Sequence, residues 1–184
     1  MTRPDKLHAT RRGGYADVEL VFDGTTVSVA GKHNNIYTQA KVSGSIDKLV
    51  DQLRDMGVAI PGADLILTRV HEQLLEDVID AKYVGHGVID GVDCEHLAFR
   101  TTETDWQIWV EIGPRPVPRK YIITSKTVTA APQYTLRIKS WTSDPKIAAD
   151  AFVFKPPSGA KLVDIRALTD IDEVPAGVVV GGRK

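Results

Sequence analysis

Strand-like alternation, interrupted by tight turns, is the feature of this sequence that most constrains its fold. Residues 105–126, DWQIWVEIGPRPVPRKYIITSK, contain two alternating segments on either side of a proline-rich turn. The Asp-Gly dipeptides at 23–24 and 90–91 supply the positive φ angles that two-residue hairpin turns require. Strands joined by such short connections pair antiparallel. The sequence therefore predicts antiparallel hairpins in both halves of the chain.

Alternating apolar and polar residues predict two groups of strands, one on each side of a helical segment. The expected strands are 15–22, 25–30, 36–42, 82–89, 92–100, 105–112, 119–126, 133–141 and 151–154. A short edge strand is also expected at 162–165. Because the connections in the second group are short, its strands are expected to form a meander.

Helical spacing replaces alternation between the two groups. Behind Ser45, a helix cap, the apolar residues are Ile46, Leu49, Val50, Leu53 and Met56, and Gly57 is the expected stop. Behind Thr68, a second cap, they are Val70, Leu74, Leu75, Val78 and Ile79. Each set forms one stripe of an amphipathic helix. Two helices are therefore expected, each with one buried face.

The predicted fold class is α+β, with one antiparallel sheet of about eight strands. A sheet of that length tends to curl, so the two helices are expected to be inserted on its concave face. A chain of 184 residues is large enough for one core without disulfides or a metal. Residues 166–184 have little patterning and are expected to form a flexible tail.

The sequence predicts a protein that is not an enzyme and that needs no cofactor. The G-x-S-x-G, H-E-x-x-H, G-x-G-x-x-G and P-loop patterns are all absent from it. Cys94 and His96 share one strand face while Asp93 and Glu95 point the other way, so a buried cysteine is expected rather than a metal site.

The overall charge and hydropathy exclude two kinds of partner. The net charge of −1 gives no general attraction to nucleic acid. No apolar run approaches the roughly 20 residues that would span a bilayer. No transmembrane segment is therefore expected.

Aromatic residues concentrate in the second group of strands, where one strand face carries Trp106, Ile108 and Val110. The candidate wall of an apolar cavity consists of that face and four helical residues, Leu49, Leu53, Leu74 and Val78. The alternative is that these side chains only complete a core.

Trp109 lies on the opposite face of the same strand, which is otherwise polar. Either curvature of the sheet half-buries it, or it belongs to an interface. With Arg119 and Lys120 beside the proline-rich turn, it forms a candidate protein interface.

Several segments resemble an uncharacterised family of predicted periplasmic proteins. They are RPDKL at 3–7, FDG at 22–24, DGVDCEHLAFR at 90–100, DWQIWVEIG at 105–113, PVPRKYIITSK at 116–126 and FKPPSGAKLVDI at 154–165. That family is in turn similar to LolA and LolB, which carry lipoproteins to the outer membrane and receive them there.

The resemblance implies a LolA-like open half-barrel as a single domain over residues 1–165, and a periplasmic location. It also implies that a signal peptide, a helix and two strands are missing ahead of residue 3, so the chain is expected to be N-terminally truncated. The loss of those elements would leave a strand edge through which a homodimer could form.

Two functions are expected from these observations. The first is a non-enzymatic envelope protein that binds an apolar ligand, a lipid or a lipoprotein acyl chain, between sheet and helices. The second is an envelope module that binds another protein and no small ligand.

Overall fold

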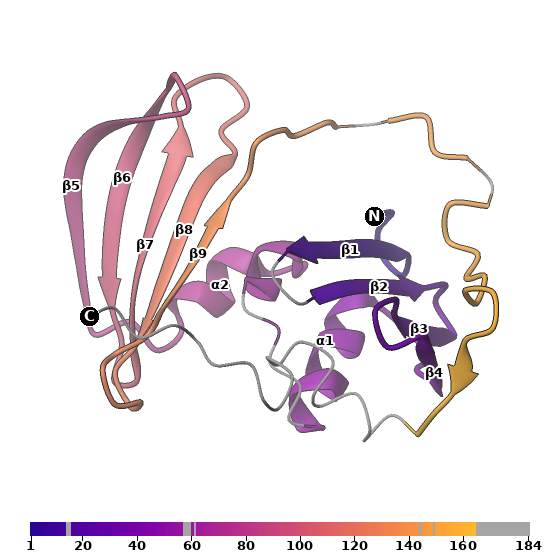
Figure 1. The fold of residues 1–184 in the computed structure, drawn as a ribbon. Coiled ribbons are helices and arrows are strands. Elements are labelled where there is room, and N and C mark those ends of the chain that lie inside the picture. Colours follow the sequence, from indigo (N-terminus) through magenta and orange to yellow (C-terminus); the bar gives the residue numbers. More distant parts are fainter. Residues whose placement is uncertain (14–15, 57–59, 61, 144, 149, 165–184) are drawn as a thin grey trace, which may run out of the picture. The chain divides into compact units, whose positions relative to one another are not determined.

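The structure is a computed structural model that describes residues 1–13, 16–56, 60, 62–143, 145–148 and 150–164. The chain forms two compact units. Of the described residues, those up to 60 and those from Ile147 to 164 form the first unit, and those from 62 to 146 form the second. Each unit is built on its own five-stranded sheet (Figure 1).

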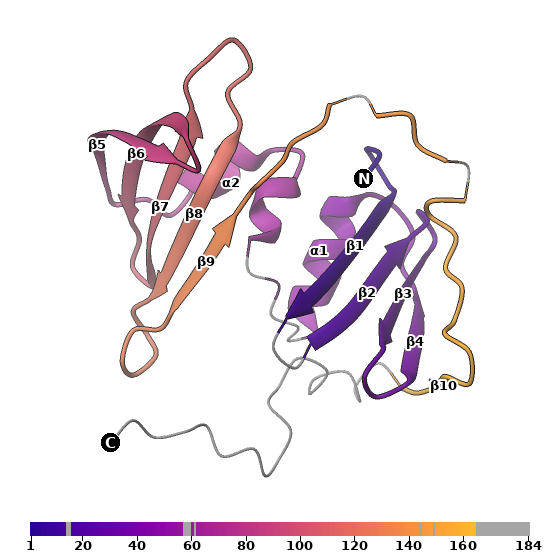
Figure 2. The same ribbon diagram turned by 45° about the horizontal axis from the view of Figure 1, so that its top comes forward.

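The sheet of the first unit begins with a four-stranded antiparallel meander. Its strands are β1 (Leu7–Gly13), β2 (Ala16–Phe22), β3 (Thr26–Gly31) and β4 (Ile36–Lys41). The short β10 (Lys161–Leu162) adds to β4 in parallel, and this strand confirms part of the predicted edge at 162–165. Figure 2 shows the four longer strands side by side.

The predicted turn at Asp23 and Gly24 joins β2 to β3. Asp23 Oδ1 accepts hydrogen bonds of 2.8 Å from the backbone N–H groups of Thr25 and Thr26. Gly24 has a φ of 96°, a conformation that side-chain-bearing residues rarely adopt. The turn therefore fixes the register in which Phe22 pairs with Val27.

Helix α1 (Ile46–Asp55) begins at the predicted cap, where the Ser45 hydroxyl accepts a hydrogen bond of 3.3 Å from the Lys48 N–H. Its four buried residues are Ile46, Leu49, Val50 and Leu53. The sheet contributes the buried Val21, Phe22, Val27 and Ala30 to the interior of the same unit. The expected stop at Gly57 lies outside the described residues.

The second unit begins with two short helical segments, the 3-10 helix η1 (Ala63–Ile66) and α2 (Val70–Leu75). An antiparallel meander follows in chain order: β5 (Asp80–Ile89), β6 (Val92–Arg100), β7 (Thr104–Glu111), β8 (Pro118–Ser125) and β9 (Gln133–Arg137). The predicted Asp90-Gly91 turn joins β5 to β6, and both of its residues have positive φ angles. The meander predicted for this part of the chain is confirmed.

One face of the second sheet carries the core of the unit, and we call it the inner face. Trp106, Ile108 and Tyr121 are its buried residues. Cross-strand pairing places Ile123 opposite Trp106, and Tyr121 opposite Ile108. Leu74 and Leu75 of α2 pack against this cluster, so α2 covers part of the inner face (Figure 1).

The prediction of one curved sheet forming an open half-barrel with two helices on its concave face is wrong. The described residues form two separate five-stranded sheets. Of the helices in this part of the chain, only α1 is longer than six residues. The described residues between Lys41 and Asp80 contain no strand, and β4 pairs with β3 and β10 instead of β5.

Individual elements also differ from the prediction. The strand expected at 151–154 is absent, since residues 151–152 form a turn and 153–154 have no regular secondary structure, and β9 ends at Arg137 rather than at Trp141. The expected cap Thr68 does not begin α2, whose N-terminal cap is Arg69 and makes no side-chain capping hydrogen bond. β1 was not predicted. The single domain over 1–165 stays a prediction, and the tail at 166–184 lies outside the described residues.

Candidate functional site

The structure brings together five of the seven predicted wall residues. Trp106 and Ile108 are buried on the inner face, and Leu74, Val78 and Val110 pack against them while remaining partly exposed. The inner face is therefore continuous in apolar character from β7 to the α2 region.

The other two wall residues belong to a different core. Leu49 and Leu53 lie on α1 in the first unit, where both are buried. They are not part of the cluster around Trp106. Sequence could not separate the two sets because both are apolar stripes of similar spacing.

Aromatic stacking positions Trp106. Its ring stacks on Phe99 with the centroids 3.9 Å apart and the planes 14° from parallel. The Tyr121 ring meets it edge-on at 5.8 Å. Contacts on two sides hold the indole in one orientation, with only 5% of Trp106 exposed.

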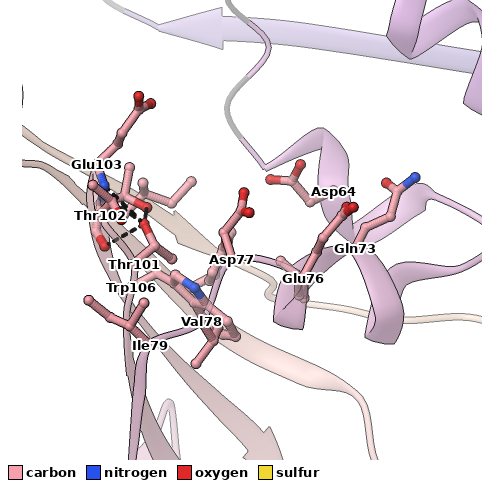
Figure 3. A pocket seen from close by; sticks show the side chains of 14 residues that line it. Asp64, Gln73, Glu76, Asp77, Val78, Ile79, Thr101, Thr102, Glu103 and Trp106 are labelled. Carbon is pink, nitrogen blue, oxygen red and sulfur yellow. Dashed lines mark hydrogen bonds between the residues drawn. The ribbon is translucent and has the colours of Figure 1, made fainter.

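A pocket of about 600 Å³ opens beside Trp106, between the α2 region and the inner face (Figure 3). Its apolar lining consists of Leu74, Val78, Ile79, Trp106, Tyr121 and Ile123. Its polar lining consists of Asp64, Gln73, Glu76, Asp77 and the turn residues Thr101, Thr102, Glu103 and Thr104. This volume lies within the range of about 300–1,000 Å³ that is usual for small-ligand sites.

Three of the predicted wall residues, Leu74, Val78 and Trp106, line this pocket. Tyr121 was missed, although the pairing of 105–112 with 119–126 in one hairpin would have put it on the Trp106 face. The polar lining was also missed, because it comes from turns and helix ends that no periodic pattern marks.

The turn between β6 and β7 forms a well-connected wall of the pocket. The Thr101 hydroxyl donates to the Thr104 carbonyl at 3.0 Å and accepts from the Thr104 N–H at 3.0 Å. It also accepts from the Glu103 N–H at 3.3 Å. Lys126 Nζ donates to the Thr101 carbonyl at 2.7 Å. These bonds fix the backbone from which the Glu103 side chain extends.

Tyr121 brings a hydroxyl group into this apolar lining. The residue is 3% exposed, and within the described chain its hydroxyl makes no hydrogen bond. Burial, and then the negative charge of Asp64, raise the pKa of Tyr121 well above its usual value. The hydroxyl therefore stays protonated and can both donate and accept.

The opposite, outer face of the second sheet carries the predicted interface residues. Trp109 stacks on His96 with centroids 3.9 Å apart, and Lys120 Nζ lies 4.5 Å from the centroid of the Trp109 ring. Arg119 Nε donates to Glu111 at 2.8 Å. All three residues are thus engaged within their own sheet, and the partly buried Trp109 packs beside neighbouring side chains.

A glycine in β5 gives Trp109 its space. A Cβ atom at Gly87 would lie 3.3 Å from Trp109 Nε1, which is tighter than an ordinary contact. The indole therefore reaches across β6 and packs over the backbone of β5. This explains how an otherwise polar face accommodates a tryptophan.

Cys94 is completely buried on β6, where its thiol donates to the Val92 carbonyl at 3.3 Å. Burial raises the pKa of the Cys94 thiol. Within the described ranges, no group of three or more His, Cys, Asp or Glu side chains is placed to hold a metal ion. In that same part of the chain, no helix has the length and apolar character needed to cross a membrane.

Comparison with known proteins gives one family match. The family model described as "Predicted periplasmic protein (DUF2092)" matches residues 1–166. No curated protein matches the sequence.

Proposed function

The chain belongs to the DUF2092 family of predicted periplasmic proteins, and from this premise we propose that it binds an apolar ligand on the inner face of its second sheet. The family membership and the periplasmic location agree with what the sequence predicted. The proposed ligand is a lipid or the acyl chain of a lipoprotein. The proposed role is carriage or capture of that ligand without chemical change.

The pocket beside Trp106 is the observation that carries this proposal. It offers an indole face, a phenol ring and four aliphatic side chains from helix, strand and turn. Each methylene group that such a lining removes from water contributes about 0.8 kcal/mol to binding. The proposal rests on this pocket and not on the likeness to LolA and LolB, because the half-barrel implied by that likeness is not the fold of the described residues.

Ile79 provides a direct test, since it lines the pocket and is 67% exposed. We expect Ile79→Glu to weaken the binding of decanol, used as the probe, by about ten-fold, because a charge replaces apolar contact with the alkyl chain. The measurement is isothermal titration calorimetry on the purified full chain. Such an exposed substitution should leave the fold intact.

Val88 is the matched control, because it is 64% exposed on β5 and lies outside the lining of the pocket. Val88→Glu should bind decanol as the unmodified protein does. Equal weakening in both variants, or no decanol binding by the folded unmodified protein, would count against the proposal.

Native mass spectrometry of the gently purified protein then identifies the natural ligand. A reproducible lipid adduct that delipidation removes is the expected result. A clean mass from folded protein would favour the second function, a protein interaction module. The same spectrum tests the predicted homodimer, for which β5 offers an edge of the second sheet.

A further inference from the structure

The polar lining of the pocket beside Trp106 is acidic. Asp64 comes from η1, Glu76 and Asp77 follow α2, and Glu103 belongs to the β6–β7 turn (Figure 3). Among the described residues that line the pocket, none is Lys or Arg. Four carboxylates from three separate parts of the unit thus surround one opening above an apolar floor.

A basic residue close to this pocket is already engaged. Lys126 Nζ donates to the Thr101 carbonyl at 2.7 Å and lies 3.5 Å from Asp105 Oδ1. Asp105 is on the outer side of β7, since Trp106 is on the inner side. Lys126 therefore offsets the charge of the pocket only in part.

The Tyr121 hydroxyl is a second and independent feature of the same pocket. Tyr121 is 3% exposed and lines the pocket. Within the described chain its hydroxyl makes no hydrogen bond. The hydroxyl can therefore donate a hydrogen bond to, or accept one from, a polar group that enters the pocket. The pocket therefore combines an apolar floor with a place for a hydrogen-bonding head group.

We propose that the pocket selects an amphiphile whose head group is a protonated amine and whose tail is an alkyl chain. This inference rests on the proposed function, because the tail occupies the apolar floor described there. The ammonium group is attracted by the carboxylates of Asp77 and Glu103 and can donate a hydrogen bond to the Tyr121 oxygen. A carboxylate head group would be repelled by the same charges.

Three probes with the same ten-carbon chain test the inference, namely decylamine, decanol and decanoate. Titration calorimetry with the purified full chain at neutral pH, below the concentration at which each probe aggregates, gives the three affinities. We expect decylamine to bind about five-fold more tightly than decanol, and decanoate to bind more weakly than decanol. The preference for the amine should shrink at high salt, because the carboxylates are at the pocket opening.

Three variants, one of them a control, test whether the pocket residues are responsible for the binding. Asp77→Asn should reduce the ratio of decylamine to decanol affinity, whereas Asp93→Asn, an exposed aspartate on β6 outside the lining, should not change it. Tyr121→Phe should weaken both decylamine and decanol, because both head groups lose a partner. Its fold should remain stable, because the hydroxyl makes no hydrogen bond within the described chain.

The outcomes distinguish a failure of the amine selectivity from a failure of the proposed function. Equal affinities for the three probes, or a preference that Asp77→Asn leaves unchanged, would overturn the amine selectivity while decanol binding still supported the pocket. Failure of all three probes to bind the folded protein would overturn both.

Discussion

Replacing Trp106 by Ala should destabilise the second unit more than other single substitutions in that unit. Trp106 is 5% exposed, stacks on Phe99 and meets Tyr121 edge-on. Deleting a buried Trp side chain typically costs about 3–5 kcal/mol, including the cavity that is left. The stacked pair with Phe99 contributes about 1 kcal/mol of that cost. We therefore expect the free energy of unfolding to fall by about 4 kcal/mol.

Urea denaturation followed by far-ultraviolet circular dichroism measures this change. Trp141→Ala is the control, because Trp141 is 45% exposed and lies beyond the end of β9. Its loss should change the free energy of unfolding by less than about 0.5 kcal/mol. Trp106→Phe should fall between the two, since it keeps an aromatic ring against Phe99. A loss of stability in Trp106→Ala no larger than in Trp141→Ala would refute the assignment of Trp106 to the core.

Three further predictions concern the turn at Asp23 and Gly24 and the buried thiol of Cys94. Gly24→Ala should lower the free energy of unfolding by about 1–3 kcal/mol in urea titrations, because φ is 96° and the new Cβ would lie 2.8 Å from Asp5 Oδ2. Burial acts to raise the pKa of Asp23, but hydrogen bonds from Thr25 and its neighbour outweigh it and lower that pKa below 3.8. The stability that ionised Asp23 provides is therefore present above pH 3.8 and lost as the pH falls through the lower folded value, and acid titration of Asp23→Ala should lack this loss. Cys94 should react with iodoacetamide only after urea unfolds the protein, because it is fully buried and its thiol pKa is raised; rapid alkylation of the native chain would contradict this.

Local patterns predicted most of the elements. The Asp-Gly turns, the meander from β5 to β9 and the Ser45 cap of α1 all depend on interactions within a few residues, and the structure confirms each of them. β1 was missed because its sequence, LHATRRG, shows little alternation of apolar and polar residues. The segment is held in the sheet by its antiparallel pairing with β2. An edge strand of this kind is specified by its partner more than by its own residues.

The candidate site was predicted only in part for a related reason. Trp106, Leu74 and Val78 belong to periodic apolar stripes, and all three line the pocket. Asp77 and Glu103 lie in turns, where a charged residue is the ordinary expectation and so carries no signal. Their common position around one opening depends on the packing of α2 against the sheet.

By itself the sequence determined most of the strands, the positions of the two Asp-Gly turns, the faces of the predicted strands, and membership in a family of predicted periplasmic proteins. The period of two and the turn dipeptides are local properties, and no long-range contact is needed to read them. Only the tertiary structure decided that the strands form two sheets and that Leu49 and Trp106 belong to different cores. Whether β4 pairs with β5, across 38 intervening residues, depends on long-range contacts that no local pattern encodes. In the described chain the two strands belong to different sheets and do not pair.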